Sequence, residues 1–215
     1  MAPKESLKLL EKKPDFGQIV VLVGPDGGGK SFLAKQLVKD QPNTILINGT
    51  QPQSWPIPEE ERQRLAKLKE RYPNNNFRYF GLISSALHRT VYELANQGKD
   101  IVVDSEQTFK WLMWEALRDN LDDAMTALTA HKINAVLPDW IRYVVPEADN
   151  FDEQAELIWQ RQNSKPEAEK SAVDPKNLGE VRARLKASEK VLSALEEIGV
   201  TIEGKPTWLT KGTGH

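Results

Sequence analysis

Gly24-Pro-Asp-Gly-Gly-Gly-Lys-Ser31 is the stretch of this 215-residue chain that decides its fold. It fits the pattern G-x-x-x-x-G-K-[ST], whose glycines let the backbone curl so that its N–H groups surround an anion. An apolar, β-branched run over 19–23 precedes it, and a helical pattern begins at Lys30. The helix therefore directs the positive end of its dipole toward the same anion. This order predicts a loop that binds nucleotide phosphates; the alternative is a glycine-rich turn in an unrelated α/β fold.

The residue types within this loop predict ATP and magnesium as its ligands. The Lys30 ammonium would reach the β- and γ-phosphates and assist transfer, and the Ser31 hydroxyl would ligate Mg²⁺. The residues expected to bind the nucleotide are Gly24, Asp26, Gly27, Gly28, Gly29, Lys30, Ser31 and Phe32.

Strands alternate with helices along the whole chain. The expected strands are 19–23, 44–47, 100–104, 140–145, 200–202 and 207–210. The expected helices are 30–39, 59–72, 79–97, 108–130, 151–162 and 178–198. This order predicts an α/β, three-layer P-loop NTPase fold, with a central parallel sheet flanked by helices and joined by right-handed crossovers. We expect one domain over 1–215, with an N-terminal extension over 1–16 and a polar, lysine-rich loop over 163–177.

Composition limits the chemistry available to the chain. There is no cysteine, and three histidines occur without clustering, so disulfides, thiolate catalysis and cysteine or histidine metal sites are not expected. The net charge of −2 argues against broad electrostatic binding to nucleic acid, although a local basic groove stays open. Apolar runs are strand-sized and no signal-peptide pattern begins the chain, so we expect no membrane segment and a cytoplasmic location.

Three segments carry a resemblance to thymidylate kinase-like P-loop kinases. Residues 24–34 resemble the start of that family's domain, and 97–104 resemble its glycine-ended helix followed by a strand that ends in Asp. Residues 141–147, with the helix that follows to Arg161, are similar to the strand and helix that lead into the family's lid. The resemblance implies transfer of a phosphate from ATP to a nucleoside or nucleotide. It also implies that Asp26 approaches the acceptor sugar, whereas the simpler interpretation is a turn residue that binds its own backbone.

Two positions depart from that family's pattern. Ser105 stands where the family has an Arg after the strand-ending Asp, and the stretch Ile47-Asn-Gly-Thr-Gln-Pro52 lacks the family's arginine. Those arginines hold the phosphate of a monophosphate acceptor, and no other side chain gives the same bidentate contact. An acceptor without that phosphate, or one bound in another way, is therefore expected.

Asp104 is the main acidic candidate outside the loop. It ends a buried strand at the edge where open α/β sheets bind ligands, so it could orient Mg²⁺ through water or accept a proton from an attacking hydroxyl. Glu106 could share the metal. The alternative is a capping role, in which Asp104 or Ser105 accepts hydrogen bonds from N–H groups of the following helix.

Arg161 is the candidate cation of the lid. It could neutralise charge on the γ-phosphate in the transition state, or it could belong to a solvated basic stretch with Lys165 and Lys170. For the two lysines the solvated interpretation is favoured.

Aromatic residues offer candidate contacts to a base. Arg78 and Tyr79 open a helix and are candidate acceptor-binding residues, with surface or core packing equally open. Trp111 and Trp114 are spaced as one helix face, which favours core packing.

Three functional hypotheses follow. The first is an ATP-dependent kinase acting on a nucleoside or nucleotide, or alternatively on a hydroxyl carried by nucleic acid, such as a hydroxymethylated pyrimidine in viral DNA. The second is a P-loop ATPase that is not a kinase. The third is a module that binds nucleotide without turnover, which the intact Lys30 and Ser31 disfavour. Association as a homodimer stays open.

Overall fold

The computed structural model describes residues 15–72, 76–130, 140–166 and 174–206, and a parallel sheet forms its centre. The strands lie in the order β2-β3-β1-β4-β5, and every neighbouring pair is parallel. They are β1 (Ile19–Val23), β2 (Thr44–Asn48), β3 (Asp100–Asp104), β4 (Trp140–Tyr143) and β5 (Thr201–Glu203). The predicted parallel sheet is confirmed.

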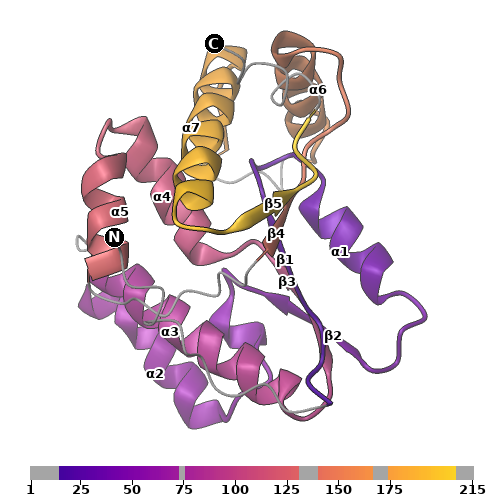
Figure 1. The fold of residues 1–215 in the computed structure, drawn as a ribbon, viewed down its shortest axis with the longest axis vertical. Helices are drawn as coiled ribbons and strands as arrows, with labels where there is room; N and C mark the ends of the chain where they lie inside the picture. The colour runs from indigo at the N-terminus through magenta and orange to yellow at the C-terminus, as the bar shows by residue number, and fades with distance from the viewer. Residues whose placement is uncertain (1–14, 73–75, 131–139, 167–173, 207–215) are drawn as a thin grey trace.

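Helices cover both faces of this sheet, as predicted for a three-layer fold (Figure 1). The helices are α1 (Lys30–Val38), α2 (Glu59–Arg71), α3 (Asn76–Ala95), α4 (Gln107–Leu117), α5 (Leu121–Ala130), α6 (Phe151–Asn163) and α7 (Leu178–Glu197), with a 3-10 turn at Pro52–Ser54. Helix α1 lies on one side of the sheet, and α3, α4 and α7 lie on the other. Right-handed crossovers explain this division, because the chain moves in opposite directions across the sheet after β1 and after β3.

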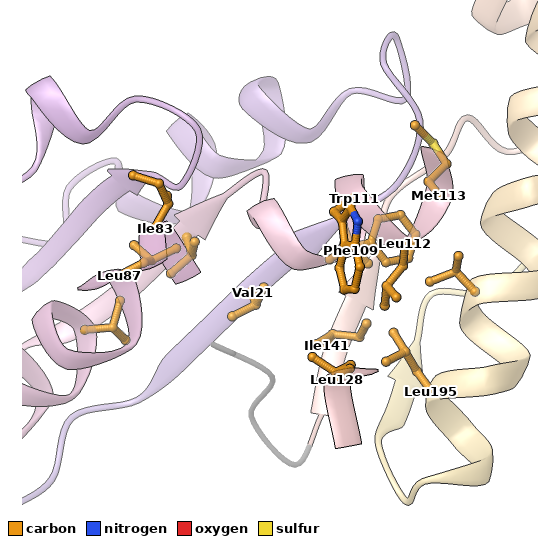
Figure 2. Packing of buried hydrophobic residues seen from close by; sticks show 14 of the residues in the cluster. Val21, Ile83, Leu87, Phe109, Trp111, Leu112, Met113, Leu128, Ile141 and Leu195 are labelled. Atoms are coloured by element: carbon orange, nitrogen blue, oxygen red, sulfur yellow. The ribbon is translucent and has the colours of Figure 1, made fainter. Parts of the chain in front are cut away.

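Two cores follow from the alternation of side chains along the strands. Val21 and Ile141 belong to the larger core, which also contains side chains of α4 and Leu195 of α7 (Figure 2). Leu22 faces the opposite side and packs in a smaller cluster that contains Ala34 of α1. Each face of a strand is thus buried by a different helix layer, as the continuous apolar run of β1 requires. Trp111 is 5% exposed within the larger core, which agrees with the packing interpretation.

The single helix predicted over 108–130 is wrong, because the chain turns between α4 and α5. Asp119 adopts a left-handed conformation, with φ of 55°, which Asp tolerates better than most side chains. The Asn120 backbone N–H donates to the Glu115 carbonyl at 2.9 Å, and its side-chain amide donates to the Glu115 carboxylate, also at 2.9 Å. These local bonds replace the continuation of the helix.

Other element boundaries shift only slightly. The strand predicted over 140–145 ends at Tyr143, and the helix predicted over 79–97 becomes Asn76–Ala95. The strand predicted over 207–210 lies outside the described residues, as does most of the N-terminal extension. In the described part of the chain, none of the helices has the length and apolar composition needed to span a membrane.

Candidate functional site

The N-terminus of α1 has no side-chain cap, unlike the N-termini of α4, α6 and α7. A side chain caps each of α4, α6 and α7, through Glu106, Asn150 and Asn177. Helix α1 instead begins after Gly29, which has φ of 102° and gives no side-chain cap, and its first turn has no acidic residue. The first N–H groups of any helix lack intrahelical acceptors, so those of α1 are suited to bind an anion.

Close packing explains two of the loop's glycines. A Cβ added to Gly24 or Gly28 would lie 2.5 Å or 2.4 Å from the carbonyl oxygen of Val144, directly after β4. Gly24 also has φ of 138°, a conformation that other residues rarely adopt. The curl of the loop therefore depends on the absence of side chains at these positions.

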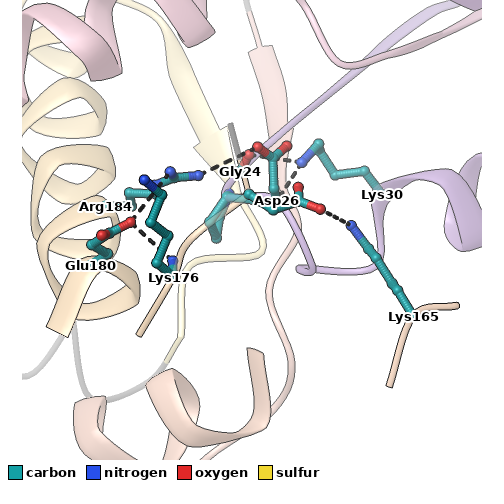
Figure 3. Close-up of polar contacts among 9 residues, drawn as sticks. Gly24, Asp26, Lys30, Lys165, Lys176, Glu180 and Arg184 are labelled. Atoms are coloured by element: carbon teal, nitrogen blue, oxygen red, sulfur yellow. Dashed lines mark hydrogen bonds and ion pairs between the residues drawn. The ribbon is translucent and has the colours of Figure 1, made fainter. Parts of the chain in front are cut away.

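Lys30 places its ammonium inside the loop. Its Nζ donates to the carbonyl oxygens of Gly24 at 2.8 Å and Pro25 at 2.7 Å (Figure 3). Burial lowers the Lys30 pKa, and the carboxylates of Asp26 and Asp104 oppose that shift. The cation is thus desolvated and held where phosphates would enter the loop.

A pocket opens beside the loop, between it and the start of α4. Phe109 and Met113 supply apolar surface. The polar lining consists of Asp26, Lys30, Thr50, Ser105, Glu106 and Lys110. A pocket with a few polar groups and an apolar wall is typical of small-molecule binding sites.

The Asp26 carboxylate lies at the wall of this pocket and among several cations. Burial raises its pKa, but the charges of Lys30, Lys110, Arg184 and Lys165 outweigh burial, so the Asp26 pKa is lowered overall. The Arg184 Nη1 atom lies 3.8 Å from Asp26 Oδ2 (Figure 3). Asp26 is therefore ionised at neutral pH and able to accept hydrogen bonds.

Asp104 and Ser105 form the turn at the carboxyl end of β3. Asp104 lies opposite Leu22 of β1, is 5% exposed and accepts a hydrogen bond from Ser105 Oγ at 3.0 Å. Ser105 has φ of 65°, and its carbonyl oxygen would lie 2.5 Å from a Cβ added to Gly49. Such left-handed, non-glycine residues concentrate at functional sites.

Glu106 fills the capping role that the sequence left open for Asp104 or Ser105. Its Oε2 accepts the Phe109 N–H at 2.8 Å, and its Oε1 accepts Ser84 Oγ at 3.3 Å. Burial raises the Glu106 pKa, although these hydrogen bonds oppose the shift. Both carboxylate oxygens are thus engaged within the protein. Among the described residues, no group of three or more His, Asp or Glu side chains could hold a metal ion.

The end of α6 lies over the phosphate loop. Arg161 Nη1 approaches the Gly28 carbonyl oxygen at 3.5 Å, and a Cβ added to Gly27 would lie 2.9 Å from Gln162 Nε2. Lys165 follows α6 and pairs with Asp174 at 3.6 Å. Arg161 therefore lies beside the loop, and its role as a lid cation stays a prediction. Lys170 lies outside the described residues.

Other predicted residues lie away from the pocket or are not described. The Phe32 side chain is 69% exposed. Tyr79 packs edge-on against Phe80, with ring centroids 5.3 Å apart, and burial raises its pKa. The Arg78 side chain lies outside what the structure describes. The Trp114 ring packs against the Arg184 guanidinium, whose Cζ lies 5.1 Å from the ring centroid.

Comparisons with known proteins identify the family of the chain and similar folds. Residues 19–188 match the family described as an AAA domain. The chain belongs to this AAA domain family. A thymidylate kinase from Candida albicans has a similar structure, with a TM-score of 0.55 and 18% identity over 91% of this chain and 88% of that one. A deoxyadenosine kinase from M. mycoides, solved with bound dATP, has a TM-score of 0.48 and 12% identity over 86% of this chain and 90% of that one. No curated protein sequence matches the chain.

The AAA domain protein thus has a P-loop kinase-like fold. The likeness to the thymidylate kinase concerns the fold, since the identity is low.

Sequence reasoning missed several residues of the AAA domain protein's site. Lys110 and Thr50 line the pocket, Gln162 packs on the loop and Arg184 pairs with Asp26. Lys110 could have been predicted as a site residue, because it lies in the first turns of the helix that follows Asp104. Arg184 is more than 150 positions from the loop along the chain, and only the packing of α7 brings it there.

Proposed function

We propose that this AAA domain protein is a kinase that transfers the γ-phosphate of ATP to a hydroxyl of a nucleoside- or nucleotide-type acceptor. The observation that carries the proposal is the uncapped start of α1, which adjoins a pocket lined by Asp26 and Lys110. The pocket shares Gly24 and Lys30 with the loop, so an acceptor bound in it would lie next to the phosphates bound by the loop.

The donor side consists of the loop, Lys30 and Arg161. Glycine N–H groups and the start of α1 would bind the phosphates, with Lys30 providing positive charge from within the loop. Arg161, beside the Gly28 carbonyl, would supply a further cation to the γ-phosphate. Because the transition state spreads negative charge over phosphoryl oxygens, cations at these positions lower the barrier.

For magnesium, Ser31 and Asp104 fit better than Glu106. The Ser31 side chain is exposed in the first turn of α1, and Asp104 lies at the end of β3 next to β1. Both Glu106 oxygens are engaged by Phe109 and Ser84, so we no longer assign it to the metal. When bound, magnesium supplies charge neutralisation for the phosphates.

On the acceptor side, Asp26 would orient the attacking hydroxyl. The acceptor oxygen forms a bond to the γ-phosphorus, and the bond from that phosphorus to the β,γ-bridging oxygen breaks, with its electron pair leaving on ADP. The acceptor proton passes to a carboxylate, for which Asp26 has the better position because it lines the pocket. Phe109 and Met113 offer apolar surface for a base.

An acceptor screen tests this proposal. Labelled ATP and magnesium would be incubated with nucleosides, nucleoside monophosphates and hydroxymethylpyrimidine-containing DNA, using the wild-type protein and Lys30→Ala. We expect label on one acceptor class, and no transfer with Lys30→Ala although its circular dichroism is unchanged. Hydrolysis of ATP at full rate without any acceptor would instead indicate an ATPase. Label on DNA alone would select the nucleic-acid alternative.

A further inference from the structure

We propose that Arg184 is a positioning residue, which holds the Asp26 carboxylate in the acceptor pocket and thereby makes α7 part of the active site. The inference rests on the proposed function and concerns a residue on the last helix, far from the phosphate loop in sequence. It assigns to Arg184 the task of orienting Asp26, not contact with either substrate.

Burial and packing restrict the conformation of the Arg184 side chain. It is 7% exposed, and its guanidinium lies over the Trp114 ring at 5.1 Å from the centroid. Such a contact is favourable and also restricts the plane of the guanidinium. The Arg184 side chain therefore extends from α7 toward the loop while it packs against Trp114 of α4.

Among the described residues, two carboxylates lie near the Arg184 guanidinium. Asp26 Oδ2 lies 3.8 Å from Nη1, and Glu180 Oε2 lies 4.0 Å from Nη2. The same Glu180 oxygen accepts the Lys176 backbone N–H at 3.0 Å, so part of its capacity is committed to the start of α7. A buried cation needs a carboxylate partner, and Asp26 serves as one.

The length of the Arg184–Asp26 pair suits a positioning role. At 3.8 Å the two atoms attract each other but lie beyond ordinary hydrogen-bond distance. An Asp26 oxygen thus keeps the capacity to accept a hydrogen bond from an acceptor hydroxyl, while the nearby charge of Arg184 attracts the carboxylate and contributes to its lowered pKa.

The other charges that face Asp26 come from different elements. Lys30 belongs to α1, Lys110 to α4 and Lys165 follows α6. Lys30 is bound to carbonyl oxygens of its own loop, and Lys110 and Lys165 are only partly buried. Arg184 is the buried cation of this group that comes from outside the loop and α1. Lys30 and Lys110 lower the Asp26 pKa more than Arg184 does, so loss of Arg184 should remove part of the positive charge around Asp26.

Arg184→Gln and Arg184→Lys test the proposal, with Arg182→Gln as the matched control. Arg182 lies on the same helix and forms an exposed pair with Asp152 at 2.9 Å, a kind of contact that contributes little to stability. The readouts are the Asp26 carboxyl titration by ¹³C NMR, acceptor KM and kcat, and Mg·ADP affinity by calorimetry.

In Arg184→Gln, loss of the positive charge should raise the titration midpoint of Asp26. Acceptor KM should rise roughly tenfold, as expected when one charged contact to the orienting group is lost. We expect Mg·ADP affinity to change by less than about threefold. Arg184→Lys should recover part of both effects because it keeps the charge, and Arg182→Gln should match wild type.

Folded Arg184→Gln protein with an unchanged Asp26 midpoint and unchanged acceptor KM would overturn the proposal. If Arg184→Gln does not fold, the proposal is tested by comparing the effect of Arg184→Lys in the wild-type protein with its effect in the Asp26→Asn variant. If Arg184 acts through Asp26, Arg184→Lys should raise acceptor KM in the wild-type background but not in the Asp26→Asn background. Equal effects in both backgrounds would refute the proposal. Should no acceptor be phosphorylated, the proposed function fails, while the NMR titration still tests the Arg184–Asp26 relationship.

Discussion

The side-chain amide of Gln162 packs directly on Gly27, so that a Cβ at Gly27 would lie 2.9 Å from Nε2. Gln162 is 3% exposed, and among the described residues neither of its amide atoms has a hydrogen-bond partner. Helix α6, which carries Arg161, is thereby joined to the phosphate loop. The loop and the end of α6 should respond together when either is altered.

Gly27→Ala should therefore lower both stability and nucleotide affinity. Gly27 has φ of 85°, so alanine adds backbone strain of about 1–2 kcal/mol as well as the clash with Gln162. We expect Tm to fall by roughly 2–8 °C and Mg·ADP binding to weaken. Gly199→Ala is the control, because Gly199 has φ of 96° and nothing lies within 4 Å of its added Cβ. Equal losses in both variants, with Mg·ADP affinity retained, would contradict the packing argument.

Glu106 offers a test between a cap and a metal ligand. Glu106→Ala removes the acceptor for the Phe109 N–H and should cost about 0.5–2 kcal/mol, the usual loss of an N-cap. Glu106→Gln keeps an acceptor oxygen and should retain most of the stability. Thermal unfolding and the magnesium dependence of transfer are the measurements. A higher magnesium requirement in Glu106→Gln, without any change in Tm, would restore the metal interpretation.

Lys110 should act on the acceptor and not on ATP. It lines the pocket and comes from α4 instead of the loop, so Lys110→Met should raise acceptor KM by roughly tenfold and leave Mg·ADP affinity nearly unchanged. Lys190→Met is a suitable control, since Lys190 lies on α7 and forms an exposed pair with Asp119 at 3.5 Å. Steady-state kinetics with the acceptor found in the screen would check this. Unchanged acceptor KM in Lys110→Met would remove Lys110 from the acceptor site.

Arg161 should affect the transfer step more than nucleotide binding. If it neutralises charge that develops in the transition state, Arg161→Ala should lower kcat by about a thousandfold. Calorimetry with Mg·ADP should then show a much smaller loss of affinity. A kcat close to that of wild type would place Arg161 among ordinary surface cations, such as Arg182.

The fold could be predicted because its signals are local. The apolar run of β1, the glycine pattern and the start of α1 are contiguous, and their physics does not depend on distant residues. The break between α4 and α5 could not be predicted, since it depends on a left-handed Asp119 and on bonds from Asn120 to Glu115. A helical pattern continues through that turn in the sequence.

Prediction of the site was less complete for a related reason. Lys30 and Asp104 stand at ends of strands or helices, where topology alone brings them together. Arg184 and Gln162 reach the loop from the faces of α7 and α6, and their positions depend on how those helices pack. In sequence Arg184 looks like one of several charged residues on an amphipathic helix.

Binding of Mg·ATP to the wild-type protein and to Lys30→Ala, measured by calorimetry, tests the central claim most directly. We predict that wild type binds with a Kd between roughly 1 μM and 1 mM, the usual range for such substrates. Lys30→Ala should lose this affinity while its unfolding transition stays cooperative. Absence of binding to wild type, or equal affinity in the two proteins, would contradict the assignment of the loop.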